Sequence, residues 1–372
     1  MADNKDKKVL NVPHLRFPEF TEGWEEVTLK EVADFQKDRV STELLNESTY
    51  ISTENIQQNF GGIQLANTVP TNANVIAYNK NDILLSNIRP YLKKVWLADR
   101  NGGCSADVFV LRSRCCEQSF LYNVIASDRF IGYVMSGAKG VKMPRGDKKQ
   151  MENFKFSLPS VIEQRKISRL LSLLDERIAT QNKIIEKYES LIKGLRVCCM
   201  QRVYGNNVHL SEIAQIYQPQ TISSTELTED GFLVYGANGI IGKYKDYNHE
   251  TEQICITCRG NTCGIVNYTK PMSWITGNAM VINTDKYQDK VYKRYLYHFL
   301  SAYNFNSIIS GSGQPQIVRT PLEKLKITLP SISEQKQKAM ILDRIQDKID
   351  INHKVLNLYI RQKQYLLCQM FI

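Results

Sequence analysis

The sequence predicts a mixed α/β (α+β) fold in which two tandem-repeated α/β domains are separated by a pair of long antiparallel coiled-coil helices, with pseudo-two-fold symmetry. A seven-residue motif occurs twice, at Leu158–Gln164 and Leu329–Gln335, 171 residues apart (329 − 158 = 171). Each copy runs into an apolar ladder of helical period, and short alternating segments precede each copy. A period this long indicates a duplicated domain rather than a solenoid of 20–50-residue repeats.

The repeat covers most of the chain. Asp107–Leu111 is similar to Asn278–Ile282 at an offset of 171 (278 − 107 = 171), whereas Ser136-Gly137 matches Ser310-Gly311 at 174 (310 − 136 = 174). A drifting offset indicates small insertions, which we expect in loops.

Each globular domain is predicted to contain short strands bounded by Gly, Asn and Asp. A helix follows in each copy, near Gln118–Ser136 and near Val291–Ser310, and a polar loop containing glycine comes next. The expected strands are Val75–Tyr78, Ile83–Ser86, Lys94–Ala98 and Val108–Leu111 in the first domain, and Phe232–Tyr235, Ile254–Thr257, Gly264–Tyr268 and Ala279–Ile282 in the second.

The two ladders have the spacing of a coiled-coil seam, because their steps alternate between four and three residues. The ladder from Ile167 to Cys199 spans 32 steps. At 1.5 Å per residue this is roughly 48 Å, longer than one turn of B-DNA at about 34 Å. Gln181 and Asn352 occupy equivalent rungs, and a polar seam residue fixes register at some cost in stability. The predicted seam residues are Leu171, Leu174, Ile178, Gln181, Ile185 and Tyr188 in the first helix, and Leu342, Ile345, Ile349, Asn352, Leu356 and Tyr359 in the second.

Both helices are expected to begin with a capping box. In such a box the serine oxygen accepts a backbone N–H, and the glutamate three residues later reaches back to the serine N–H. The two pairs are Ser160 with Glu163 and Ser331 with Glu334.

Composition points to an anionic partner, because the net charge is +10 and the sequence pI is about 9.0. No 18-residue apolar run predicts a membrane span, and Met1–Lys8 lacks the apolar stretch of a secretory signal. Nine cysteines, an odd number, favour free thiols and a cytoplasmic location. Cys255, Cys258 and Cys263 lack a second pair or nearby histidines, so no metal site is expected.

Two loops in each domain carry the chemistry of nucleic-acid recognition. Gly137–Lys149 holds five basic residues and one acid, and its counterpart Gly311–Arg319 is rich in glutamine. Ser86–Lys94 and Thr257–Thr262 offer Asn, Arg and hydroxyl groups. Arg and Lys hold phosphates or guanine, and Gln can pair with adenine. The candidate DNA contacts are Asn87, Arg89, Lys93, Lys94, Lys139, Lys142, Arg145 and Lys148 in the first domain, and Lys243, Lys245, Arg259, Asn261, Gln314, Gln316 and Arg319 in the second.

Motifs for catalysis are missing from the sequence. There is no GxxxxGK[ST] loop, no Asn/Asp-Pro-Pro-Tyr run, no Gly-x-Ser-x-Gly elbow and no His-Glu-x-x-His, and the five histidines are scattered. We therefore expect no catalytic residues and no bound cofactor. Two alternatives stay open: a coiled-coil adaptor with two protein-binding heads, and a DNA-modifying enzyme whose active site is unrecognised.

Several of these segments together resemble the specificity (S) subunits of type I restriction-modification systems. Trp24–Leu29 looks like the family's entry to its first recognition domain, and Val234–Gly242 looks like a segment common in these domains. Pro159–Gln164 and Pro330–Gln335 resemble the family's Pro-x-x-x-Glu-Gln entry to its spacer helices. The resemblance covers roughly residues 13–372. The first domain departs from the Tyr-Gly-x-Asn-Gly pattern, with Tyr50–Ile56 near that place.

The resemblance implies that each domain is a target-recognition domain that reads one half of a bipartite site in double-stranded DNA. The helix pair would set the unread gap and dock two methyltransferase (M) subunits, which methylate adenine with S-adenosylmethionine. Restriction (R) subunits would add ATP- and Mg²⁺-dependent cleavage, and none of these cofactors would bind this chain. The implied parts are an N-terminal segment 1–23, target-recognition domain 24–158, spacer helix 159–205, target-recognition domain 206–329 and spacer helix 330–372.

Overall fold

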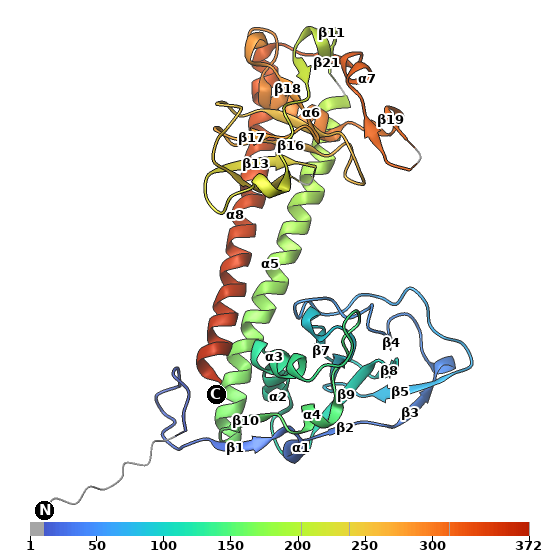
Figure 1. Ribbon diagram of the computed structural model, residues 1–372, viewed down its shortest axis with the longest axis vertical. Coiled ribbons are helices and arrows are strands. Elements are labelled where there is room, and N and C mark those ends of the chain that lie inside the picture. The colour runs from blue at the N-terminus through green and yellow to red at the C-terminus, as the bar shows by residue number, and fades with distance from the viewer. Residues whose placement is uncertain (1–10, 202, 238, 312, 372) are drawn as a thin grey trace, which may run out of the picture. The chain divides into compact units, whose positions relative to one another are not determined.

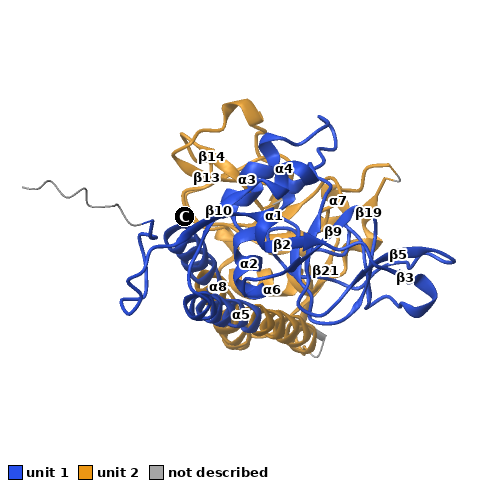
Figure 2. Cartoon of the chain, turned by 90° about the horizontal axis from the view of Figure 1, so that it is seen from below, with its two compact units in different colours: residues 1–180, 356–372 blue, residues 181–355 orange. Residues whose placement is uncertain are grey.

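A computed structural model describes residues 11–201, 203–237, 239–311 and 313–371 (Figure 1). Asn238 of the second-domain motif, Ser312 of the glutamine-rich loop and residues 1–10 of the N-terminal segment lie outside the described residues. The chain forms two compact units, coloured separately in Figure 2. Unit 1 comprises the described residues of 1–180 and 356–372, and unit 2 comprises those of 181–355.

Unit 1 is built on an antiparallel sheet of order β2-β9-β6-β7. All four residues of β6 are buried, because neighbouring side chains point to opposite faces and both faces are covered. Ile83 and Leu85 pack with the helices, and Leu84 packs in a second cluster. These elements are β2 (Ala33–Phe35), β6 (Ile83–Ser86), β7 (Val95–Leu97), β9 (Val108–Ser113), α2 (Gln118–Ile125) and α3 (Asp128–Ser136).

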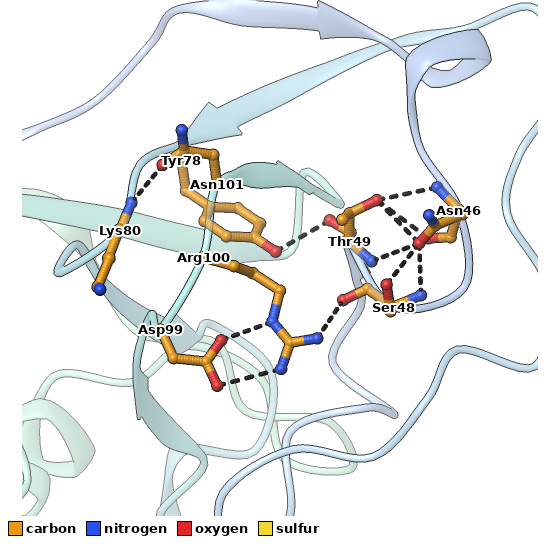
Figure 3. A network of polar contacts seen from close by, with 8 residues as sticks. All are labelled: Asn46, Ser48, Thr49, Tyr78, Lys80, Asp99, Arg100 and Asn101. Carbon is orange, nitrogen blue, oxygen red and sulfur yellow. Dashed lines mark hydrogen bonds and ion pairs between the residues drawn. The ribbon is translucent and has the colours of Figure 1, made fainter.

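A second sheet of unit 1 has the order β3-β5-β8-β4, with β4 parallel to β8. A polar network ties the segment before β4 to this sheet (Figure 3). The Tyr78 hydroxyl donates to the Thr49 carbonyl at 2.9 Å, and the Arg100 guanidinium pairs with Asp99 and donates to the Ser48 carbonyl. The strands are β3 (Arg39–Ser41), β4 (Tyr50–Ile51), β5 (Asn74–Tyr78) and β8 (Gly102–Cys104).

The remaining short elements of unit 1 connect these sheets to the first long helix, and β1 pairs antiparallel with β10 directly before that helix. They are β1 (Glu25–Thr28), α1 (Leu29–Val32), η1 (Thr42–Leu44), η2 (Pro90–Leu92), α4 (Lys148–Glu152) and β10 (Lys155–Leu158).

Unit 2 repeats the same plan. Its sheet has the order β12-β18-β15-β16, in which each strand takes the place of one in the unit 1 sheet, and β13 runs parallel to β17 as β4 does to β8. The principal elements are β12 (Gln215–Tyr217), β13 (Phe232–Gly236), β14 (Gly239–Tyr244), β15 (Ile254–Thr257), β16 (Val266–Tyr268), β17 (Trp274–Ile275), β18 (Ala279–Asn283) and α6 (Lys293–Ala302). The domain duplication expected from the sequence is therefore confirmed in the strand order.

Shorter elements complete unit 2, and β11 pairs with β21 as β1 pairs with β10. They are β11 (Asn206–His209), η3 (Leu210–Glu212), η4 (Ser224–Glu226), η5 (Asp285–Tyr287), η6 (Phe305–Ser307), β19 (Ile309–Ser310), β20 (Gln316–Ile317), α7 (Arg319–Glu323) and β21 (Lys326–Leu329).

The two long helices are α5 (Val161–Gln201, 41 residues) and α8 (Ile332–Met370, 39 residues). They pack on each other within each unit. In unit 1 the Lys363 ammonium lies 2.6 Å from the Asp175 carboxylate, and in unit 2 the Gln181 amide donates to Asn352. Within unit 2, Gln181 of α5 bonds to Asn352 of α8, and the later Arg196 of α5 bonds to the earlier Gln346 of α8, so the pairing is antiparallel. Of the twelve predicted seam residues, Leu171, Leu174, Gln181, Ile185, Leu342 and Ile349 are buried, and Ile178, Tyr188, Ile345, Asn352, Leu356 and Tyr359 are half-buried.

Two predicted helices differ from the structure. The single helix expected near Gln118–Ser136 is wrong, because the chain leaves the helical conformation at Ala126 and the Ser127 hydroxyl caps a new helix by accepting from the Phe130 N–H at 3.2 Å. The helix expected near Val291–Ser310 is shorter and covers Lys293–Ala302. The Lys94–Ala98 and Gly264–Tyr268 strands also lose residues at their ends, and Ile83–Ser86 and Ile254–Thr257 are confirmed.

Only the serine half of each predicted capping box is formed. Ser160 Oγ accepts from the Glu163 N–H at 3.4 Å, and Ser331 Oγ accepts from the Glu334 N–H at 3.3 Å. The glutamates turn elsewhere. The buried Glu163 carboxylate accepts two hydrogen bonds from Arg16, at 2.7 and 2.8 Å, and Glu334 pairs with the Lys338 ammonium at 2.9 Å. An ionised partner is a stronger donor than a backbone N–H, which explains the departure.

Candidate nucleic-acid interface

The two candidate recognition loops of unit 1 are joined by their backbones. We call residues 86–94 loop A and residues 137–149 loop B. The Arg89 N–H donates to the Pro144 carbonyl at 2.8 Å, and the Gly146 N–H donates to the Asn87 carbonyl at 3.1 Å. Loop A follows β6 directly, and loop B follows α3 directly. The two loops thus form one surface on a rigid sheet and helix.

The corresponding loops of unit 2, residues 257–262 (loop A′) and 311–319 (loop B′), are joined in the same way. The Gly260 N–H donates to the Pro315 carbonyl at 2.9 Å, and the Ile317 N–H donates to the Cys258 carbonyl at 3.0 Å. Every donor and acceptor lies 171 residues after its counterpart in unit 1 (260 − 89 = 171; 317 − 146 = 171). Arg145 therefore corresponds to Gln316 (316 − 145 = 171).

This backbone equivalence corrects one detail of the repeat. Gly140 and Gly311 both have φ near +93°, and they lie 171 residues apart (311 − 140 = 171). Ser136-Gly137 is therefore not the counterpart of Ser310-Gly311. Ser136 ends α3, whereas Ser310 ends β19. The insertion that the sequence match implied between these loops is absent.

Two residues of loop A other than glycine have a left-handed backbone conformation. Arg89 has φ +50° and Lys93 has φ +53°, and the equivalent positions in unit 2 are Gly260 at +81° and Gly264 at +92°. For a residue with a side chain this conformation costs roughly 1–2 kcal/mol relative to the right-handed one, and glycine adopts it freely. Strained residues of this kind cluster at functional sites, where the side chain is needed.

Most candidate cations of unit 1 lie beside an acid. Lys93 pairs with Asp128 at 2.5 Å, Lys139 with Asp147 at 2.8 Å, Arg145 with Asp107 at 3.0 Å and Lys148 with Glu152 at 3.9 Å. The hydrogen bond from the Lys139 ammonium lowers the pKa of Asp147, and the same bond raises the pKa of Lys139. Lys139 and Arg145 are exposed, and exposed pairs of this kind are weak enough to exchange for a phosphate or a base.

The other candidates of unit 1 have different surroundings. Arg89 and Lys142 are exposed, and neither has an acidic partner within salt-bridge distance among the described residues. Lys94 is half-buried and donates to the Thr53 carbonyl at 2.6 Å. The side-chain oxygen of Asn87 is buried and has no hydrogen-bond partner in the described part of the chain. Lys94 and Asn87 are therefore less accessible to a ligand than Arg89 and Lys142.

In unit 2, the backbone bonds bring Arg259 and Asn261 of loop A′ together with Gln314 and Gln316 of loop B′, and all four are exposed. Three further candidates lie on neighbouring elements. Lys243 in β14 pairs with Asp230 at 3.3 Å, Arg319 at the start of α7 pairs with Glu323 at 2.6 Å, and Lys245 follows β14.

Sequence reasoning missed the structural role of two glutamines, which connect the long helices to α2 and α6. Gln164 and Gln335 are buried, and each amide donates to the carbonyl of the proline five residues earlier, at 2.7 and 2.9 Å. The Gln164 side-chain oxygen accepts from the Glu117 N–H at the start of α2, and that of Gln335 accepts from the Tyr292 N–H at the start of α6, at 2.7 and 2.8 Å. Gln164 fixes α5 to the start of α2, and Gln335 fixes α8 to the start of α6. The signal was present, because Glu-Gln closes both copies of the motif.

Comparison with known proteins identifies the family. Residues 21–190 and 206–358 each match the family described as "Type I restriction modification DNA specificity domain". The chain belongs to this family. Its two DNA specificity domains account for the repeat, and the family description names DNA recognition. None of the described helices is long and apolar enough to span a membrane.

Relatives support the assignment along the whole chain. The type I restriction enzyme MjaVIII specificity subunit of Methanocaldococcus jannaschii is 26% identical over 408 residues, covering 94% of this chain and 92% of that protein. The EcoprrI specificity subunit of Escherichia coli is 32% identical over 147 residues, covering 38% and 36%. The crystal structure of a type I S subunit from M. genitalium has the same fold, with a TM-score of 0.67, 18% identity and coverage of 97% and 99%.

Proposed function

We propose that this chain is the non-catalytic recognition subunit of a type I restriction-modification complex, and that residues 24–158 and 206–329 are target-recognition domains that each read one half of a bipartite site in double-stranded DNA. The observation that carries this proposal is the repeated loop pair. Identical backbone bonds hold loops A and B and loops A′ and B′, whereas the side chains at equivalent positions differ, as in Arg145 and Gln316. A shared scaffold with different side chains suits two readers of different sequences.

The proposed reading combines two kinds of contact. Lys and Arg hold phosphates, which supply affinity that falls with salt, and side chains on the loops discriminate base edges. The proposed contacts are Asn87, Arg89, Lys93, Lys94, Lys139, Lys142, Arg145 and Lys148 in the first domain, and Lys243, Lys245, Arg259, Asn261, Gln314, Gln316 and Arg319 in the second. The net charge of +10 supports an anionic ligand of this kind.

We propose that the spacer helices, in the segments 159–205 and 330–372, set the length of the unread gap and dock two methyltransferase subunits. The hydrogen bond between Gln181 and Asn352 supports a fixed register between the helices, because a slip would leave the buried Gln181 without its half-buried partner. The N-terminal segment 1–23 would brace the first helix, since Arg16 pairs with Glu163.

The chemistry would reside in the partner subunits. Methyltransferase subunits would use S-adenosylmethionine to methylate adenines, and restriction subunits, where present, would use ATP and Mg²⁺ to cleave DNA. All nine cysteines are free thiols, which supports the cytoplasm as the place of action.

Methylation mapping tests this proposal. A host that carries the chain with its methyltransferase subunit should methylate adenines in a split motif, and exchanging residues 24–157 for another first domain should change one half only. A contiguous motif, or a change in both halves, would contradict it. Binding with little dependence on salt would favour the protein-binding adaptor, and DNA modification by the purified chain alone would favour the enzyme.

A further inference from the structure

A third segment of unit 1 joins the surface formed by loops A and B. We call residues 52–64 the amide loop, because its tip is Gln57-Gln58-Asn59. The Asn59 N–H donates to the Leu92 carbonyl, and the Phe60 N–H donates to the Lys93 carbonyl, both at 3.0 Å. Leu92 and Lys93 belong to loop A. The amide loop, loop A and loop B are therefore linked in series by backbone hydrogen bonds.

Backbone strain is concentrated at this junction. Seven residues other than glycine have positive φ in the described part of the chain, and four of them lie here: Asn59 (+54°), Phe60 (+60°), Arg89 (+50°) and Lys93 (+53°). This conformation costs roughly 1–2 kcal/mol for Phe60, Arg89 and Lys93 and less for asparagine, and such residues persist where the surrounding structure enforces them. The strain therefore extends from loop A into the amide loop, so the two share one constrained surface.

The base of the amide loop is firmly anchored. The Lys94 ammonium donates to the Thr53 carbonyl at 2.6 Å, and the buried Asn55 side chain accepts from the Ser52 N–H at 2.7 Å. Ile56 is fully buried, and Phe60 packs against the main core of unit 1. The β4 strand that leads into the loop is held by the network of Figure 3, where Thr49 accepts from Tyr78. The loop is therefore already ordered, and binding a ligand costs little further conformational entropy of its backbone.

The tip of the loop presents uncommitted amides. Gln57, Gln58 and Asn59 are exposed, and their side chains make no hydrogen bond within the described chain. A glutamine or asparagine amide can form a bidentate pair with adenine, in which its N–H donates to N7 and its oxygen accepts from the N6 amino group, and the amide carries no charge. The chemistry of the tip is thus that of base reading.

Unit 2 has different chemistry at the equivalent place. The parallel pair β4–β8 corresponds to β13–β17, in which Tyr235 pairs with Ile275, and the chain after β13 turns into a hairpin with exposed Ile240 and Ile241. Aliphatic groups cannot form a bidentate pair with adenine. Residues 232–244 contain no glutamine, so the Gln57-Gln58 pair has no counterpart in this hairpin, and any base that it reads lies in one half of the DNA site.

We propose that the amide loop is a third base-reading element of the first domain, in which Gln57 and Gln58 recognise an adenine in the half-site that loops A and B also contact. The proposal rests on the proposed function. It extends the set of specificity-determining residues to a segment that ends 22 residues before loop A begins (86 − 64 = 22).

Single and double variants test it. The full chain carrying Gln57→Ala, Gln58→Ala or both is expressed with its methyltransferase subunit, and methylated adenines are mapped in the host and in a pool of random duplex DNA. Asn67→Ala, another exposed amide, is the matched control. The double variant should lose preference at one position of one half-site by about tenfold or more, and the slope of binding against salt should not change.

The outcomes separate the proposal from its foundation. The unchanged second half of the motif reports that the variant is folded. If the double variant keeps the wild-type motif, or loses affinity equally for all sequences with a smaller salt slope, the amide loop does not read bases. If the unaltered chain directs no split motif, the proposed function itself fails, whatever the variants do.

Discussion

The Gln181 amide donates to the side-chain oxygen of Asn352 at 2.5 Å and to its carbonyl at 3.2 Å, across the seam of α5 and α8. Gln181 is buried, and the residues of the pair lie 171 positions apart in the sequence, so each copy of the repeat contributes one partner. The polar residue of one apolar ladder is therefore hydrogen-bonded to the equivalent polar residue of the other ladder.

Replacing one member of this pair should destabilise the helix pair more than replacing both. Gln181→Leu leaves the Asn352 oxygen without its partner, which costs about 1–3 kcal/mol, whereas Gln181→Leu with Asn352→Leu restores an apolar seam and should be close to neutral or stabilising. Thermal unfolding of the single and double variants measures this, with Asn182→Leu on the exposed face as control. Additive effects in the double variant would show that the two side chains are not coupled.

The helices, the seam and the duplication could be predicted because their signals are local and periodic. Gln181 and Asn352 were identifiable since each interrupts an apolar ladder at the same rung. Loop A was identifiable as a polar segment after a strand and loop B as one after a helix, whereas the bond between Arg89 and Pro144 that joins them follows only from the folded backbone. The fold class and family were confirmed, and the individual DNA contacts stay predictions.

What the sequence did not predict depends on contacts between distant residues. Strand β8 contains Gly102 and Gly103, which have poor strand propensity. A Cβ at Gly103 would lie 2.6, 2.7 and 2.8 Å from the side chains of Leu45, Val75 and Val40. Arg16 is half-buried and pairs with the buried Glu163, 147 residues away, which no local pattern reveals. The break before Ser127 lacks the Gly or Pro that usually marks a helix end.

Arg89→Gly should separate strain from binding. Glycine relieves the left-handed conformation of Arg89, so the free energy of unfolding should rise by up to about 1 kcal/mol. DNA affinity should nevertheless fall, and the salt slope should decrease by about one phosphate contact. Asn81→Gly is the control, because Asn81 has φ +73° at the other end of β6. Asn81→Gly should raise the free energy of unfolding and leave DNA binding unchanged. If Arg89→Gly and Asn81→Gly bind DNA equally well, Arg89 does not contact DNA.

His298 should make the stability of unit 2 depend on pH. Its imidazole is fully buried. The Arg196 Nε–H of α5 donates to His298 Nδ1 at 3.2 Å, and His298 Nε2 lies 2.8 Å from the Asp343 carboxylate of α8. The Arg294 guanidinium also donates to this carboxylate. Burial lowers the pKa of His298, although the hydrogen bond to Asp343 opposes the shift. The folded state therefore holds neutral histidine, and its contribution to stability is complete above a pH of about 6.5 and is lost as the pH falls through the lower folded pKa.

The measurement is the unfolding temperature between pH 7.5 and 5.5. In the unaltered chain the unfolding temperature should fall by a few degrees as the pH falls from 7.5 to 5.5. His298→Asn cannot titrate, so its unfolding temperature should depend less on pH. His353→Asn replaces an exposed histidine of α8 and should leave the slope as it is. A slope that His298→Asn does not alter would assign the pH dependence to other groups.

Exchanging the side chains at Arg145 and Gln316 should exchange base preference between half-sites. The two residues occupy the same backbone position in loops B and B′. Asp107, which pairs with Arg145, is equivalent to Asn278 (278 − 107 = 171), because their carbonyls accept from the equivalent Asn87 and Cys258 N–H groups. Arg pairs with guanine and Gln with adenine, with discrimination of about 1–3 kcal/mol for a bidentate pair. Arg145→Gln with Asp107→Asn should therefore change one position of the first half from guanine to adenine. Gln316→Arg with Asn278→Asp should make the reverse change in the second half, and methylation mapping would detect both. A change in the wrong half would refute the equivalence of the loops, whereas an unchanged motif would show that neither side chain reads a base.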